Sequence, residues 1–240
     1  MSDESRQRGE SLAGRLEAVR SKMRAATLRR PAELRDEPEP RLVAVSKRHR
    51  LEAIEDVLAL GQLDFGENYA QEFRDKLAAR PEDDAIRWHF IGQLQSNKIK
   101  YLVGNCLIHT VDRVSLLEVL ERRAASAGVT QSFLVEVNAG EAQKGGVDPA
   151  GLGALLDAVG DHPHLHCAGL MTMAPAVEAA ATRPYFRRLR ELRDREARKD
   201  RRGVELRELS MGMSGDFEVA IEEGATLVRV GSAIFGERPS

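Results

Sequence analysis

The chain has 240 residues, of which 42% are hydrophobic and 31% are charged, a composition typical of globular proteins. The formal charge of -2 excludes polyanion binding driven by net charge. The two cysteines form no CxxC pair, which argues against a disulfide framework or a zinc site and favours a reducing cytoplasmic location. The sequence shows no secretory signal and no run of about 20 apolar residues, so we expect no membrane contact.

The first forty residues differ from the rest. Leu12, Leu16, Val19 and Met23 recur at helical spacing and predict one amphipathic helix. The Pro- and acid-rich segment ELRDEPEPR that follows is typical of a linker. We therefore predict two parts, an N-terminal helix with a linker over residues 1–40 and a main domain over residues 41–240, with the helix packed on the outside of that domain.

From residue 41, short β-prone runs alternate with longer helical segments, which implies parallel strands joined by crossovers. Eight such strands after a leading helix predict an α/β fold, a single TIM-type (β/α)8 barrel with one extra N-terminal helix. The predicted strands are Leu42–Ser46, Leu63–Phe65, Arg87–Ile91, Cys106–Thr110, Ser132–Asn138, His166–Met171, Glu205–Ser210 and Leu227–Val230. The predicted helices are Leu51–Leu60, Tyr69–Ala79, Ser96–Tyr101, Val114–Ala125, Pro149–Val159, Thr182–Arg201 and Phe217–Glu223.

Small residues follow the last two predicted strands, at the carboxyl ends where a barrel gathers its active site. These are the segments SMGMSG from Ser210 and GS from Gly231. The turns after strands seven and eight are the usual phosphate site of this fold, because exposed backbone N–H groups there receive an anion. Glycines that merely shape a turn explain either segment alone, whereas both together favour a phosphorylated ligand.

Lys47 ends the apolar run LVAVSK and should therefore lie in the barrel mouth. Closure of the barrel places the first strand beside the eighth and so brings Lys47 near Arg229 and Gly231. A partly desolvated lysine beside a fixed cation is a nucleophile towards carbonyls. An amine next to a phosphate cradle is the minimal equipment for holding pyridoxal 5'-phosphate as an imine. A lysine that only contributes charge to a phosphate is the alternative, and spacing does not decide between the two.

Eight motifs in order carry a resemblance to a known family. They are AVSKRH, DFGENYAQE, WHFIGQLQSNK, HTVDR, VEVNAGEAQKGGV, GLMTMAP, LSMGMSGDFEVAI and VRVGSAIFG. With them the sequence closely resembles the pyridoxal phosphate homeostasis protein family from about Leu42 to Arg238. That family is similar to the barrel half of bacterial alanine racemase, so the resemblance implies an alanine racemase N-terminal-domain-like fold.

The resemblance implies pyridoxal 5'-phosphate as cofactor and Lys47 as the lysine that forms the imine. It places Arg229 opposite the pyridine nitrogen, where a guanidinium keeps that nitrogen unprotonated. Glu136 and Lys144 flank the stretch VEVNAGEAQKGG and are expected to line the mouth. In the family this stretch is a loop at the opening, which implies that Lys144 receives or hands over the cofactor; a solvated surface lysine is the alternative. The remaining implied cofactor-binding residues are Gly231, Ser232, Ser214 and Ser210 at the phosphate, Asn68 near the cofactor, and His89 and Met171 in the pocket wall.

One departure from the racemase pattern bears on function. A racemase takes a catalytic tyrosine from a C-terminal domain and from its dimer partner, whereas this sequence stops at Ser240. Because racemisation needs an acid or base on each face of the substrate, we expect no catalytic residues and a role in buffering or delivering the cofactor. Expected partners are the cofactor and pyridoxal-phosphate-dependent apoenzymes as recipients, with no nucleic acid, no metal site and a monomeric state. The alternative is a pyridoxal-phosphate-dependent racemase or related amino-acid enzyme.

Overall fold

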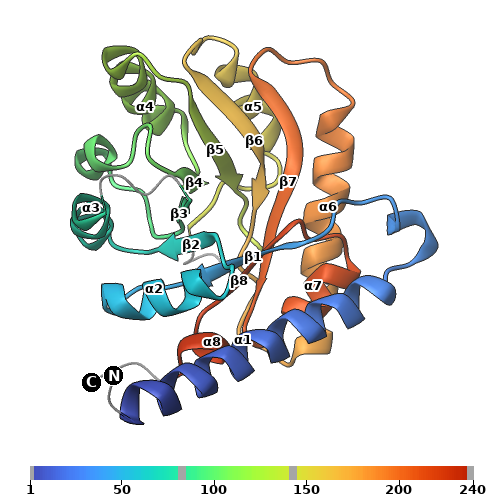
Figure 1. Cartoon of the computed structure of the whole chain (residues 1–240). Coiled ribbons are helices and arrows are strands. Elements are labelled where there is room, and N and C mark those ends of the chain that lie inside the picture. The colour runs from blue at the N-terminus through green and yellow to red at the C-terminus, as the bar shows by residue number, and fades with distance from the viewer. Residues whose placement is uncertain (1–2, 81–84, 141–144, 237–240) are drawn as a thin grey trace.

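The computed structural model describes residues 3–80, 85–140 and 145–236, so Lys144 lies outside the described residues. Eight parallel strands form one closed barrel in chain order, with β1 paired to β8 (Figure 1). The predicted (β/α)8 barrel is confirmed. The strands are β1 (Arg41–Val45), β2 (Asp64–Glu67), β3 (Arg87–Phe90), β4 (Leu107–Val111), β5 (Gln131–Glu136), β6 (Leu165–Met171), β7 (Val204–Met213) and β8 (Leu227–Val230).

Helices surround the barrel on its outer face (Figure 1). The α-helices are α1 (Asp3–Leu28), α2 (Leu51–Ala59), α3 (Ala70–Ala79), α4 (Val114–Ala127), α5 (Leu152–Val159), α6 (Arg183–Ala197), α7 (Phe217–Glu222) and α8 (Ser232–Phe235). The described ranges also contain the 3-10 helices η1 (Ala32–Leu34), η2 (Ser96–Tyr101) and η3 (Ala179–Thr182), so the predicted third helix is a 3-10 helix. In the described part of the chain, no helix has both the length and the apolar character needed to cross a membrane.

Most strand residues are buried, and every residue of β2 and β8 is, as expected when a parallel sheet is covered by helices outside and filled by side chains inside. The larger apolar cluster contains buried side chains from the strands and from the helices that cover them. A smaller cluster of Val43, Leu134, Met171 and Leu227 is buried separately. These four lie on strands β1, β5, β6 and β8, so the second cluster joins opposite walls of the barrel.

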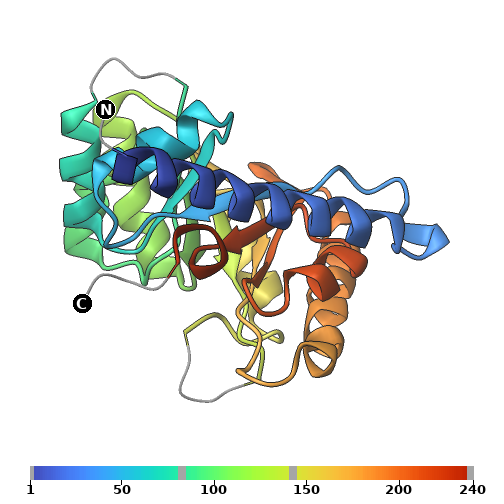
Figure 2. The same cartoon turned by 60° about the horizontal axis from the view of Figure 1, so that its bottom comes forward.

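The N-terminal helix packs on the outside of the barrel, as its apolar stripe predicted. Leu12, Leu16, Val19 and Met23 are all buried. Helix α1 contacts α7 and α8 and lies across the outside of the molecule beside them (Figure 2). The helix therefore covers the elements that follow the last two strands.

Strand β7 is longer than predicted, because it continues past Ser210 to Met213. The register with β8 shifts between Ser210 and Met213, and Gly212 has a φ of 91°, a conformation that favours glycine. The extension moves the end of this strand three residues along the chain. Met213 and Ser214, rather than Ser210, therefore lie at the carboxyl rim.

Candidate functional site

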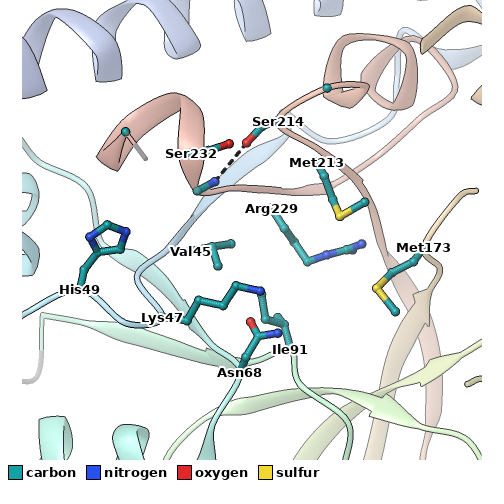
Figure 3. Close-up of a pocket in the computed structure, with 13 residues that line it drawn as sticks. Val45, Lys47, His49, Asn68, Ile91, Met173, Met213, Ser214, Arg229 and Ser232 are labelled. Carbon is teal, nitrogen blue, oxygen red and sulfur yellow. Dashed lines mark hydrogen bonds between the residues drawn. The ribbon is translucent and has the colours of Figure 1, made fainter. Parts of the chain in front are cut away.

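A pocket with a volume of about 290 Å³ opens at the carboxyl ends of the strands. It lies at the lower end of the roughly 300–1,000 Å³ range of small-molecule sites. Figure 3 shows the side chains of Lys47, Asn68 and Arg229 directed toward a common space, with Ser214 and Ser232 beside it. The lining residues are Val45, Lys47, His49, Asn68, Ile91, Met173, Met213, Ser214, Gly215, Arg229, Gly231, Ser232 and Gly236.

Lys47 lies two residues beyond the end of β1 and is half-buried. Strand β1 pairs with β2 on one side and with β8 on the other, so barrel closure brings Lys47 into one pocket with Arg229 and Gly231, as predicted. The next residue, Arg48, has a φ of 63°, and its N–H donates to Glu72 Oε1 at 2.6 Å. A non-glycine residue in this conformation costs free energy that neighbouring contacts must offset.

A buried ion-pair cluster supports the turn that carries Lys47. Lys76 Nζ donates to the carbonyl of Ser46 at 2.9 Å, to Glu67 Oε1 at 2.7 Å and to Glu72 Oε1 at 2.7 Å. Ser46 Oγ also donates to Glu67 Oε1 at 2.6 Å. Burial raises the pKa of Glu67, and the nearby Lys76 opposes this effect. The backbone on both sides of Lys47 is thus hydrogen-bonded to one cluster of charged side chains.

Arg229 is 4% exposed and projects from β8 into the pocket. Its Nη1 donates to Ser210 Oγ at 2.6 Å, and its Nη2 donates to the carbonyl of Thr172 at 2.9 Å. Burial lowers the pKa of Arg229 to about 10, although the charges of Glu136 and Asp216 act in the opposite direction. The guanidinium therefore remains a cation at neutral pH and presents a fixed set of donors.

The turns after β7 and β8 meet at the other side of the pocket. The N–H of Gly231 donates to Ser214 Oγ at 3.3 Å, and Ser232 lies beside this contact (Figure 3). The N–H of Met213 donates to Asp216 Oδ1 at 2.6 Å and so closes the turn after β7. Two hydroxyls and the backbone of two turns are gathered here, which suits an anionic oxygen cluster better than an apolar group.

Asn68 carries an unsatisfied buried oxygen. Its Oδ1 is buried and has no hydrogen-bond partner within the described ranges. Because a buried polar atom without a partner is costly, a ligand that donates a hydrogen bond to it is favoured. The position of Asn68 depends on Gly92, since a Cβ at residue 92 would lie 1.9 Å from the carbonyl oxygen of Asn68.

Three predicted cofactor residues lie below the pocket instead of lining it. His89 and Ser210 are buried in the barrel interior, where His89 contacts His109 and Asp64, and Ser210 contacts His109 and Arg229. Met171 belongs to the smaller apolar cluster. Each of the three lies within a strand, and its side chain faces the inside of the barrel rather than the rim.

Several lining residues were not predicted as site residues. Val45, Ile91, Met173 and Met213 form apolar walls, and His49 stacks on Phe235 with ring centroids 4.7 Å apart. His49 had one usable signal, because it lies two residues beyond Lys47 in the motif AVSKRH. The apolar residues gave none, since a valine or methionine at a strand end is equally typical of the core.

Glu136, predicted at the mouth, is 6% exposed and does not line the pocket. Burial and the nearby charge of Asp112 raise its pKa to about 7, against the opposing effect of Arg229. Within residues 3–80, 85–140 and 145–236, no three His, Cys, Asp or Glu side chains are grouped so as to hold a metal ion. The charged chemistry of the described site therefore comes from Lys47, Arg229 and the buried carboxylates near them.

The fold and the site define a TIM-type barrel with a lysine and an arginine beside a rim of serine hydroxyls and backbone turns. A sequence profile described as the alanine racemase N-terminal domain matches residues 21–239. The pyridoxal phosphate homeostasis protein of Aquifex aeolicus is 47% identical over 201 residues, which cover 82% of this chain and 87% of that protein. The chain belongs to the pyridoxal phosphate homeostasis protein family.

Solved structures agree with this assignment. PipY of Synechococcus elongatus PCC7942 has been solved with PLP (pyridoxal 5'-phosphate) bound. It is 36% identical to this chain with a TM-score of 0.80, and the match covers 94% of this chain and all of that chain. An alanine racemase of Clostridium difficile has a TM-score of 0.71 at 12% identity, over 96% of this chain and 57% of that chain. The second likeness shows a shared barrel fold and nothing about activity.

Proposed function

We propose that this protein binds pyridoxal 5'-phosphate covalently through Lys47 and buffers or delivers it inside the cell. The observation that carries the proposal is the convergence of Lys47, Asn68 and Arg229 on one pocket whose other side is a rim of hydroxyls and backbone turns. The bound cofactor supplies an aldehyde for the amine of Lys47 and a phosphate for the rim.

The chain's own residues divide the work of binding. Lys47 provides the nucleophile, held in place by the buried cluster around Lys76. Arg229 is a cation at neutral pH and offers N–H donors to the pyridine nitrogen, so that nitrogen receives a hydrogen bond rather than a proton. Ser214, Ser232 and the backbone at Gly231 receive the phosphate, and the unpartnered oxygen of Asn68 accepts a hydrogen bond from the ligand.

The proposed role is non-catalytic, with pyridoxal-phosphate-dependent apoenzymes as recipients, a monomeric state and a cytoplasmic location. The names of the relatives, which refer to homeostasis, support a carrier role. The two cysteines support a reducing compartment, because both are free and burial raises the pKa of each thiol, to about 12 for Cys167.

The test is covalent trapping of the cofactor. Borohydride reduction of the protein loaded with pyridoxal 5'-phosphate, followed by peptide mass spectrometry, should place the adduct on Lys47. Lys47→Ala should lose the adduct and the visible imine band while keeping its fold, because a half-buried lysine contributes little to core packing. Lys22→Ala, an exposed position on α1, is the control and should keep both. An undiminished band in Lys47→Ala, with another lysine modified, would overturn the assignment.

A further inference from the structure

A continuous chain of hydrogen bonds runs through the barrel interior below the pocket. Nη1 of Arg229 lies 2.6 Å from Ser210 Oγ, which lies 2.9 Å from Nδ1 of His109. Nε2 of His109 lies 2.9 Å from Nδ1 of His89, whose Nε2 lies 3.0 Å from Asp64 Oδ1. Each of these residues is at most 4% exposed. The interior of such barrels is usually filled by branched apolar residues, so a buried chain of hydrogen-bonded polar side chains is unusual and needs a physical explanation.

The lower end of this hydrogen-bond chain, at Asp64, fixes the direction in which its hydrogen bonds are donated. Arg87 donates to both carboxylate oxygens of Asp64, at 3.0 and 2.6 Å. Burial alone would raise the pKa of Asp64, but the hydrogen bonds from His89 and Arg87 more than offset it and hold the pKa well below its usual range. Asp64 is therefore a carboxylate that only accepts, and Nε2 of His89 must carry the proton that it shares with Asp64.

The upper end of the hydrogen-bond chain, at Arg229, requires the same direction of donation, from Arg229 toward Asp64. A guanidinium only donates, so Ser210 Oγ accepts from Arg229 and directs its own proton to Nδ1 of His109. His109 then carries its proton on Nε2 and donates to Nδ1 of His89. With one proton on each imidazole, every contact has one donor and one acceptor, and reversing any single bond would place two donors or two lone pairs face to face.

The surroundings keep both imidazoles neutral. Burial lowers the pKa of His89 and lowers that of His109 well below its usual value. The charge of Arg41 acts in the same direction on both rings, and Arg229 adds to it at His109, whereas Asp64 and Glu208 oppose it at His89. Arg41 itself is paired with Glu208 and Asp64 below the rings.

We infer that Ser210, His109, His89 and Asp64 form a one-way hydrogen-bond chain that orients the guanidinium of Arg229 toward the ligand pocket. The serine and the two histidines are positioning residues, because they act through Arg229 and do not line the pocket. The consequence for the ligand ring rests on the proposed function, whereas the direction of the chain rests on the contacts alone. Neutral rings in this arrangement hold Arg229 in place and carry no proton to the pocket.

The direction of the chain is tested on the unliganded full-length protein. Long-range ¹H–¹⁵N correlation spectra should show His89 and His109 as neutral rings with the proton on Nε2 between about pH 7 and 8.5. A proton on Nδ1 of either ring, or a protonated ring within this range, would overturn the inference. This measurement needs no variant and no cofactor, so its result is independent of the proposed function.

The effect on Arg229 is tested with Ser210→Ala, and Ser132→Ala is the matched control. Ser132 Oγ contacts His166 Nδ1 at 3.4 Å, so the control removes a serine–histidine contact that does not involve Arg229. Ser210→Ala should still form the borohydride adduct on Lys47, but the absorbance maximum of the bound cofactor should shift and its affinity should fall about tenfold, as for loss of a hydrogen bond to a charged group. Ser132→Ala should leave both unchanged.

Identical spectra and affinities for the two variants would overturn the positioning role. If the wild type forms no adduct with the cofactor, the proposed function fails while the spectra of the two histidines still decide the direction of the chain. If Ser210→Ala does not fold, those spectra of the wild type remain the deciding measurement.

Discussion

Arg48 is a strained residue next to the proposed cofactor lysine, since it is a non-glycine residue with a φ of 63° in the described structure. Its backbone N–H donates to Glu72, and its guanidinium lies 5.6 Å from the ring centre of Tyr69. Left-handed backbone costs about 1–2 kcal/mol for residues other than glycine. The turn therefore stores strain directly after Lys47, and the Lys76 cluster holds it.

This strain predicts opposite effects of two substitutions. Arg48→Gly should leave the free energy of unfolding unchanged or raise it by up to about 1 kcal/mol, because glycine adopts this φ freely. Arg48→Val should lower it by at least about 1 kcal/mol, because a β-branched side chain is the least compatible with it. Urea unfolding of both variants measures the difference, and equal stabilities would show that the backbone at Arg48 is not strained.

Residue 92 must be glycine because the backbone of Asn68 lies close to it, and not because of its φ. An added Cβ would lie 1.9 Å from the carbonyl oxygen of Asn68, a backbone atom that cannot rotate away. Gly92→Ala should therefore destabilise the protein by more than about 2 kcal/mol. Gly215→Ala is the control, because its added Cβ meets no atom within 4 Å. Thermal unfolding compares the two, and a control as unstable as Gly92→Ala would contradict the explanation.

At the scale of elements, one arginine joins helix α1 and its following segment to the barrel. Arg30 is 3% exposed and donates to the carbonyls of Ile221, Ala225, Glu37 and Pro38. Burial lowers its pKa. The Pro- and acid-rich segment after α1 is thus fixed to the end of α7, which its composition alone did not indicate.

Removal of the Arg30 side chain should lower the free energy of unfolding. Arg30→Ala leaves four carbonyls without their donor, and we expect a loss of about 3 kcal/mol or more in the free energy of unfolding. Arg35→Ala, at an exposed position in the same segment, should change it by less than about 0.5 kcal/mol. Chemical denaturation separates the two, and a small effect of Arg30→Ala would show that water replaces these hydrogen bonds.

The end of α6 makes stability depend on pH. Burial alone would raise the pKa of Glu196, but hydrogen bonds from Lys199, Arg201 and Arg195 more than offset it and lower the pKa to about 2. Because the folded pKa lies below the unfolded one, the stabilisation is present above about pH 4.5 and is lost as pH falls toward 2. The protein should therefore lose stability on acidification across this window.

The variant Glu196→Gln measures how much the charge of Glu196 contributes to stability. At pH 7, Glu196→Gln should be of the order of 2 kcal/mol less stable than the wild type, and the difference should shrink between pH 5 and 2. Asp161→Asn, on the exposed surface, is the control and should follow the wild type. A difference for Glu196→Gln that stays constant with pH would assign the effect to packing instead of charge.

At the scale of the whole molecule, periodicity was sufficient for the fold. Eight alternating runs predicted eight parallel strands, and closure then required β1 beside β8. That single topological step brought Lys47 and Arg229, which are 182 positions apart in the sequence, into one pocket. The proximity followed from a closed barrel and needed no knowledge of side-chain contacts.

The sequence could not place inward-facing residues near strand ends at the correct depth in the barrel. Ser210 was predicted at the rim because β7 was expected to end there, but the strand continues to Met213. His89 lies one residue before the end of β3 and faces inward to Asp64 and His109. Both residues face the inside of the barrel, so an error of a few residues in the end of a strand exchanges the pocket for the interior below it. For the same reason the sequence did not predict the hydrogen-bond chain below the pocket.

The final prediction concerns catalysis by the loaded protein. Racemisation needs a proton acceptor on one face of the substrate carbon and a donor on the other. Among the described residues that line the pocket, no tyrosine is present, and Lys47 and His49 are the side chains of the kinds that serve as general acids or bases. His49 is stacked on Phe235, and Arg229 remains a cation that gives the pyridine nitrogen no proton. We therefore expect poor stabilisation of a carbanion and, at most, slow exchange at the α-carbon with retained configuration.

Incubation of L- and D-alanine with the loaded protein in heavy water measures both processes at once, because exchange and inversion are read from the same resolved enantiomers. An alanine racemase serves as the positive control, and Lys47→Ala shows which exchange depends on the proposed cofactor lysine. The carrier role predicts deuterium in the starting enantiomer without the opposite one. Inversion of either enantiomer at roughly 1 per second or faster, a typical enzymatic turnover, would replace the carrier role by that of a racemase.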